Sequence, residues 1–483
     1  MKKISSRKPV LSALFWKFLE RFGVQCSQFV LQIILARILA PEHYGVLSMM
    51  IIFTTLANVF IQRGFNTALV QNKDVTEEDY SSVFWITLCV AAIMYGVLFW
   101  SAPAIAKFYN MPDLVQPFRV LCLVLFPGAV NSIQLAKVNR EMDFKKVFQS
   151  NVVAILLAGV VGVLLALRGG GLWALVAQNI LNVTVACAIM WFTVRWRPRF
   201  VCNFGRIKVL FSYGWKLLVS GLLDTLYQDL RSLVIGKKYD SGTLGYYSRG
   251  KQFPQFIINA INTSVQSVLL PAMSAEQGDN AKVKAMMRKS IIVSAYVIFP
   301  MMAGLAGVAE PLVKLLLTDK WLPCVPYMQI YCFTFAFYPV HTSNLQAINA
   351  MGRSDTFLKL EIIKKIQGVV LLLIAVFCFD SPIAIAMTGL IGTVTGSFIN
   401  AYPNKKLVGY SYFEQMKDIL PSLLIALIMF GCVLAVGMLE FPVLLLLVLQ
   451  VIVGVLVYFV LSVLFQLEAF KYLLKMVKSK LHS

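Results

Sequence analysis

Apolar runs of about twenty residues recur along this whole chain and restrict the folds that it can adopt. A helix of that length crosses the hydrocarbon core of a bilayer. About fourteen runs follow one another, near 11–36, 44–62, 82–106, 116–136, 147–167, 172–194, 209–235, 244–270, 289–317, 325–350, 358–379, 383–403, 418–438 and 441–465. They are too long for barrel strands and lack strict alternation. Lipid cannot satisfy an open backbone, so the sequence predicts an all-α polytopic membrane protein.

Composition and the distribution of charge agree with this prediction. The chain is 59% hydrophobic and 14% charged, too apolar for a soluble protein of 483 residues. Its 44 Lys and Arg against 23 Asp and Glu would suit nucleic acid, but the basic residues gather between the apolar runs. Roughly four basic residues lie on one side of the membrane for every one on the other side. Because basic residues favour the cytoplasmic side, this predicts that both termini are cytoplasmic. We therefore expect membrane lipids and no nucleic acid as partners.

A weak internal repeat divides the chain. At an offset of about 200 residues, Trp16 and Lys17 align with Trp215 and Lys216. Gly45 of APEHYGVLS then aligns with Gly245 of YDSGTLGYYS. Each copy holds six apolar runs, as in transporters with two pseudo-symmetric lobes. The repeat predicts an N-lobe at 1–205, a C-lobe at 206–410, two extra helices at 411–466 and a basic amphipathic cytoplasmic tail at 467–483.

The tail carries apolar residues on one helical face and lysines elsewhere. Leu467, Phe470, Leu474, Val477 and Leu481 share that face. This pattern is expected of a helix that lies on an anionic leaflet. A basic anchor flanking the last span explains it equally well.

Polar residues form one face on several of the predicted spans. The first carries Lys17, Arg21, Gln25, Gln28 and Gln32, the second Thr55, Asn58 and Gln62, the seventh Lys216, Ser220, Asp224, Gln228 and Arg231, and the eighth Arg249, Gln252, Gln255, Asn259, Asn262 and Gln266. Their spacings of three and four are helical. Isolated charge in hydrocarbon costs several kcal/mol, so such faces line a bundle interior or a wet cavity. We interpret them as the lining of one water-filled cleft between the lobes.

Other interpretations of these faces stay open. Polar residues also join helices to one another, and Lys17 and Lys216 lie near span ends, where lysines snorkel to the headgroups. Glu20, Asp224 and Asp229 are candidates for proton or sodium coupling, but salt-bridge partners explain them equally well.

No constellation of catalytic residues is recognisable. The three histidines lie far apart in sequence, and the nine cysteines have no paired spacing. Gly169, Gly170 and Gly171 lack the following Lys-Ser of a phosphate loop. The sequence therefore predicts no enzyme, metal or cofactor, apart from a coupling H⁺ or Na⁺.

Several short segments together resemble a known family. ARILAPEHYGVLSM (36–49), SSVFW (81–85), NREMDFKK (139–146), GTLGYYSRGKQF (242–253) and VLLPAMSAEQGD (268–279) occur in this order. They are similar to bacterial polysaccharide exporters of the multidrug/oligosaccharidyl-lipid/polysaccharide superfamily, closest to the O-antigen (Wzx-type) and colanic-acid group. The resemblance implies a flippase in the bacterial inner membrane, which moves undecaprenyl-pyrophosphate-linked oligosaccharide by alternating access for lipopolysaccharide, capsule or exopolysaccharide synthesis. Other polysaccharide-assembly membrane proteins are possible partners.

Such a substrate suits the polar faces by its chemistry. Cations would neutralise its pyrophosphate, for which we nominate Lys17, Arg21, Lys216, Arg231, Arg249 and Lys251. Amides would bond its sugar hydroxyls, for which we nominate Gln25, Gln28, Gln32, Asn58, Gln228, Gln255, Asn259, Asn262 and Gln266. An alternative is a multidrug or small-cation antiporter of the same superfamily, which favours a more acidic, aromatic cleft. A glycan polymerase or ligase is less favoured, because no long connecting loop is visible.

Overall fold

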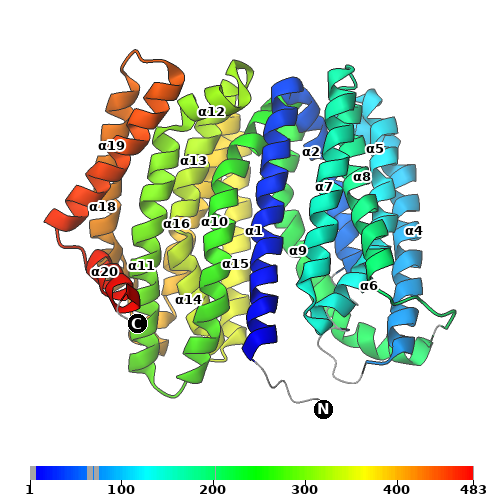
Figure 1. Cartoon of the computed structure of the whole chain (residues 1–483), viewed down its shortest axis with the longest axis horizontal. Helices are drawn as coiled ribbons and strands as arrows, with labels where there is room; N and C mark the ends of the chain where they lie inside the picture. The colour runs from blue at the N-terminus through cyan, green and yellow to red at the C-terminus, as the bar shows by residue number, and fades with distance from the viewer. Residues whose placement is uncertain (1–6, 63–68, 70–74, 202, 482–483) are drawn as a thin grey trace. The chain divides into compact units, whose positions relative to one another are not determined.

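The computed structural model describes residues 7–62, 69, 75–201 and 203–481 (Figure 1). Side chains are described in these ranges except at 7–15, 17, 18, 20, 21, 204, 206, 209–213, 216 and 476–481. Here the chain forms α-helices and short 3-10 helices and no strand. Ten helical segments of this part are long and apolar enough to cross a membrane. The chain is thus an all-α, multi-pass membrane protein, while the total of about fourteen spans stays a prediction.

The helices form two compact units, Met1–Gly245 and Tyr246–Ser483. The first contains α1 (Arg7–Ile38), α2 (Pro41–Gln62), α4 (Glu77–Tyr109), α5 (Val115–Leu121), α6 (Leu125–Glu141), α7 (Phe144–Leu167), α8 (Leu172–Thr193) and α9 (Phe204–Lys238), and α10 (Ser241–Ala275) begins there. The helix α9 groups with the first unit because it packs against α2 and α4. The lobe boundary at residue 205, like the other predicted domain boundaries, stays a prediction.

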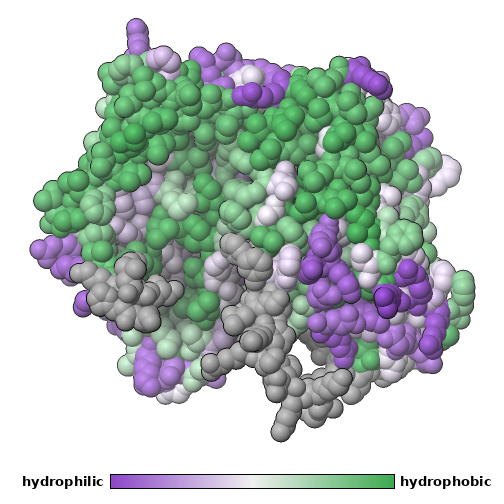
Figure 2. Space-filling model, in the orientation of Figure 1, coloured by the Kyte–Doolittle hydropathy of each residue, from purple (hydrophilic) through white to green (hydrophobic). Residues whose placement is uncertain are grey.

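The second unit contains most of α10 and all later helices. These are α11 (Asn280–Gly307), α12 (Ala309–Leu317), α13 (Val325–Ala336), α14 (Tyr338–Ala350), α15 (Ser354–Cys378), α16 (Pro382–Ala401), α17 (Asn404–Leu407), α18 (Tyr412–Gly437), α19 (Val443–Leu464) and α20 (Glu468–Leu481). The helix α11 packs against α18, and α18 packs against α19. Figure 2 shows apolar side chains over the outer surface of α18 and α19, where Leu444, Val455 and Phe459 are exposed. Apolar side chains that face outward are expected of helices in contact with lipid.

Three of the predicted spans are interrupted: the ninth breaks at Val308 between α11 and α12, and the fourth and tenth break at corresponding places in the predicted repeat. The fourth consists of the 3-10 turn Pro112–Leu114, α5, the 3-10 turn Cys122–Val124 and α6. The tenth breaks at Phe337 between α13 and α14. Pro339 contributes to this break, because proline has no N–H to donate to the preceding turn. Interrupted helices in matching positions are a feature of transporter folds, where they accompany binding sites.

Gly45 and Gly245, which the repeat aligns, meet within the first unit. A methyl group at Gly45 would lie 1.6 Å from the carbonyl oxygen of Ser241, and one at Gly245 would lie 2.2 Å from that of Pro41. The N-terminal turns of α2 and α10 therefore touch backbone to backbone. Only glycine permits such an approach, since every other residue carries a Cβ.

Candidate functional site

The polar face of α10 begins with Arg249, whose side chain contacts residues of the second unit. Its side chain is only 5% exposed. The guanidinium donates to Oε1 of Gln252 and lies 5.4 Å from the ring centre of Trp321, in the 3-10 turn Asp319–Cys324. A guanidinium over an indole face is stabilised without losing its charge. Arg249 therefore supplies positive charge here while it also fills a packing position.

Lys251 is the next cation on α10 and lies beside Tyr331. Its Nζ is 5.7 Å from the ring centre of Tyr331, whose hydroxyl is hydrogen-bonded to that of Tyr247. No carboxylate of the described part of the chain pairs with Lys251. An ammonium that lies beside an aromatic ring and has no carboxylate partner keeps its charge available to an anionic ligand.

The amides further along α10 have two kinds of surroundings. Asn262 accepts a hydrogen bond from the hydroxyl of Thr342 and so ties α10 to α14. Gln255 is half-buried, whereas Asn259 and Gln266 are exposed. The exposed amides are free to exchange hydrogen bonds with water or with sugar hydroxyls.

In the first unit the amides of α1 face away from its main neighbour. Gly23 packs on Phe148 of α7, and Leu31 faces Gly159 of the same helix. At 100° per residue, the predicted amides at 25, 28 and 32 lie roughly 130° round the helix from that contact. They are half-buried. The side chains of Lys17, Glu20 and Arg21 lie outside the described residues, so their roles stay predictions.

The remaining nominated residues are spread over α2 and α9. On α2, Asn58 is half-buried and its Oδ1 faces Gly128 of α6. On α9, Asp224, Asp229 and Arg231 are half-buried and Gln228 is exposed. The guanidinium of Arg231 lies 5.9 Å from the ring centre of Tyr227 on its own helix. The side chain of Lys216 lies outside the described residues.

A polar cluster at His341 was missed by sequence reasoning. Its Nε2 lies 2.9 Å from the carbonyl oxygen of Thr393, and its Nδ1 lies 2.8 Å from Nδ2 of Asn400. Nearby on α15, Glu361 and Lys364 form an ion pair at 2.5 Å. The sequence did indicate this ion pair, because the two charged residues lie inside the apolar run 358–379 at i, i+3 spacing. The histidine gave no signal, since its partners are remote in sequence.

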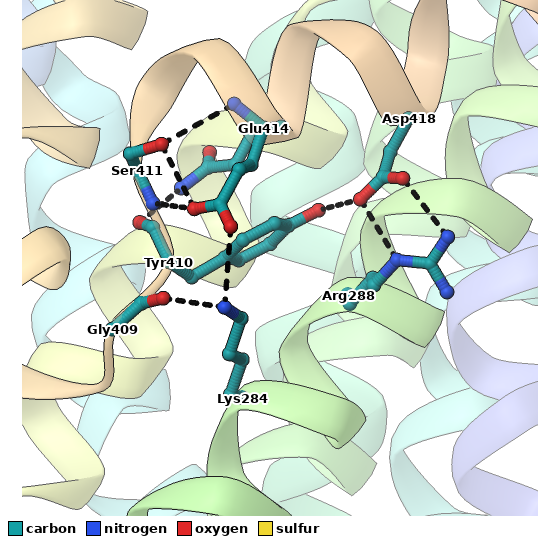
Figure 3. A network of polar contacts seen from close by, with 8 residues as sticks. Lys284, Arg288, Gly409, Tyr410, Ser411, Glu414 and Asp418 are labelled. Atoms are coloured by element: carbon teal, nitrogen blue, oxygen red, sulfur yellow. Dashed lines mark hydrogen bonds and ion pairs between the residues drawn. The ribbon is translucent and has the colours of Figure 1, made fainter.

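A second network joins the ends of α11, α18 and α20, and Figure 3 shows the part of it that links Lys284 and Arg288 of α11 to residues 409–418. Arg288 of α11 donates to both carboxylate oxygens of Asp418, each at 2.9 Å, and to those of Glu468 at 2.8 and 2.7 Å. The hydroxyl of Tyr410 donates to Asp418 at 2.6 Å, and Lys284 pairs with Glu414 at 3.3 Å. Burial, and then the bond to Asp418, raise the pKa of Tyr410, which therefore stays a neutral donor. This network holds the C-terminal helices to α11.

Comparison with known proteins places the chain in a family. The model of a family described as "Polysaccharide biosynthesis protein" matches residues 34–326. Among relatives, the succinoglycan biosynthesis transport protein ExoT of Rhizobium meliloti is 25% identical, over 86% of this chain and 82% of its own. The lipopolysaccharide biosynthesis protein WzxC of Escherichia coli is 22% identical, over 87% of this chain and 83% of its own.

Solved structures show the same fold. The lipid II flippase MurJ in an inward closed conformation superposes with a TM-score of 0.76 at 14% identity, over 94% of this chain and 98% of its own. An inward-facing multidrug resistance MATE family transporter gives 0.61 at 15% identity, over 81% of this chain and 98% of its own. The family model covers more than half of the sequence, and the chain therefore belongs to the polysaccharide biosynthesis protein family.

Proposed function

We propose that this protein is a flippase that moves a lipid-linked oligosaccharide across the bacterial inner membrane by alternating access, with both termini in the cytoplasm. The observation that carries this proposal is on α10, where Lys251 lies beside Tyr331 with no carboxylate partner in the described residues, and the exposed amides of the polar face follow. Relatives named for polysaccharide transport and synthesis, and the MurJ-like fold, support it. All of these are transport or assembly proteins, and we assign the chain no enzymatic step.

The substrate chemistry matches the order of groups along α10. A lipid pyrophosphate is a dense anion, and it binds best to cations that no carboxylate already neutralises. Lys251 meets that condition, and Arg249 adds charge two residues earlier on the same helix. The exposed amides at Asn259 and Gln266 then offer donors and acceptors to sugar hydroxyls. The polyprenyl tail stays in lipid during transport, so no free energy is needed to move it into water.

A multidrug antiporter is the second candidate, because MATE transporters share the fold. Its cationic substrates would be repelled by a site that presents Arg249 and Lys251. The higher TM-score to the lipid II flippase agrees with the first candidate.

The coupling ion and the protein partners are further parts of this proposal. H⁺ or Na⁺ would bind where carboxylates are half-buried within a span, as at Asp224 and Asp229 of α9. Glu20 is a third candidate for coupling. Other membrane proteins of polysaccharide assembly would deliver the substrate and receive the product.

Lipid analysis of a deletion strain tests the proposed function. Loss of the chain should stop export of the surface glycan and raise the pool of lipid-linked repeat units in the inner leaflet. A plasmid copy should reverse both effects. Normal surface glycan with no rise in the lipid-linked pool would rule out the flippase.

A further inference from the structure

The segment at 194–201, between α8 and α9 of the first unit, begins with an alternation of buried and exposed side chains. Val194 and Trp196 are buried, and Arg195, Arg197 and Arg199 are exposed. The Trp196 ring packs against Tyr80 of α4 at 6.1 Å between ring centres. The segment thus turns one side to the protein and presents an arginine row on the other.

Hydrogen bonds hold the segment against α4 although it has no regular secondary structure. The backbone N–H groups of Arg199 and Asn203 donate to the hydroxyls of Ser81 and Ser82, each at 3.0 Å. The indole N–H of Trp85 donates to the carbonyl oxygen of Arg199 at 2.9 Å. These bonds fix the backbone at Arg199, and the packing of Trp196 holds the backbone next to Arg195, which lowers the entropy lost on binding.

None of the three arginines pairs with a carboxylate in the described part of the chain, and they differ in their other contacts. Arg197 is used internally, since its Nη1 donates to the carbonyl oxygens of Val194 and Trp196 at 2.8 and 2.7 Å. Arg195 and Arg199 pair with no carboxylate of the part of the chain that the structure describes. Glu77, at the start of α4, is already paired with Lys137 at 3.1 Å. Two guanidinium groups therefore remain for an external anion.

Exposed aromatic rings flank the arginine row. Phe200 is 90% exposed and stacks on Trp85 at 5.0 Å between ring centres. Phe192, in the last turn of α8, is 78% exposed. In water such rings would be poorly placed, but aromatic residues are enriched where a span meets the headgroups. The segment begins at the end of a span, and so its rings lie at that level.

We infer that this segment is a binding site for the phosphate headgroup of an anionic phospholipid. Arg195 and Arg199 take the phosphate, because a guanidinium fork matches its oxygens. Phe200 and Phe192 contact the glycerol and upper acyl region. A soluble anion or an acidic protein would satisfy the arginines but would leave the rings in water. The site binds a lipid of the surrounding leaflet and uses none of the residues of the polar face of α10.

Titration of the purified full-length protein with short-chain lipids tests this inference. In a neutral detergent, short-chain phosphatidylglycerol should bind saturably, measured by calorimetry, while phosphatidylcholine of equal chain length and inorganic phosphate should bind at least tenfold more weakly. The R195Q/R199Q variant should bind phosphatidylglycerol at least tenfold more weakly. The F200S variant should also weaken lipid binding while leaving the affinity for inorganic phosphate unchanged.

K405Q/K406Q is the matched control, because it removes two exposed lysines from the second unit and the same net charge. Its affinity should stay within twofold of the wild type. R195K/R199K guards against misfolding, since it keeps the charge but loses the planar fork, and it too should bind more weakly. Equal affinity for inorganic phosphate, equal loss in the control, or unchanged binding in both arginine variants would overturn the inference. The readout needs no transport, so failure here leaves the flippase proposal standing.

Discussion

The backbone contact at Gly45 makes a substitution there a direct test of the fold. An ordinary contact needs about 3.4 Å, and the added methyl group of Gly45→Ala would start at 1.6 Å from the Ser241 oxygen. The N-terminal turns of α2 and α10 would thus have to separate by about 1.8 Å. Forced overpacking costs about 1–3 kcal/mol, and backbone on both sides puts this case at the upper end. Alanine returns up to about 1 kcal/mol of helix propensity. The net loss of stability is about 2 kcal/mol.

Thermal unfolding of the purified protein in detergent measures this loss. For a unit of this size, about 2 kcal/mol lowers Tm by about 4–8 °C. Gly245→Ala should lower it less, because its methyl group starts at 2.2 Å from the Pro41 oxygen and needs a smaller shift. Gly96→Ala is the control, since no heavy atom lies within 4 Å of the added group and the helix should gain stability. A Tm for Gly45→Ala at or above that of the wild type would refute the close approach of the two helices.

Three other substitutions test the polar groups. Lys251→Gln should cut export of the lipid-linked glycan about tenfold at unchanged Tm, as measured by the lipid-linked pool in living cells. The control Lys405→Gln, at an exposed lysine, should leave export normal. Equal export by both variants would contradict the proposed role. Arg288→Gln should lower the free energy of unfolding by about 1–2 kcal/mol and speed proteolysis of α20, because two carboxylates lose a bidentate partner. Arg353→Gln, which removes an exposed ion pair, should change neither the stability nor the proteolysis. His341→Ala should cost about 1–3 kcal/mol by thermal unfolding, since it leaves the amide of buried Asn400 without its partner. An unchanged Tm would show that water replaces the ring.

Hydropathy alone determined the helical segments of this protein. Lipid leaves a backbone no partner outside its own helix, so each apolar run of sufficient length forms a helix, and every predicted span coincides with helical structure. The polar face of α1 followed from spacing in the same way. Such features depend on neighbours three or four residues away, and the sequence records these directly.

Only the tertiary structure decided which residues contact each polar face. Spacing placed Arg249 and Lys251 on α10, but it contained no sign that Trp321 and Tyr331 would cover them. The partners of His341 lie more than fifty residues away, and the break at Phe337 depends on packing around the helix as well as on Pro339. Contacts between remote segments arise from the way helices pack. A pattern with a period of 3.6 residues carries no information about which helix becomes the neighbour.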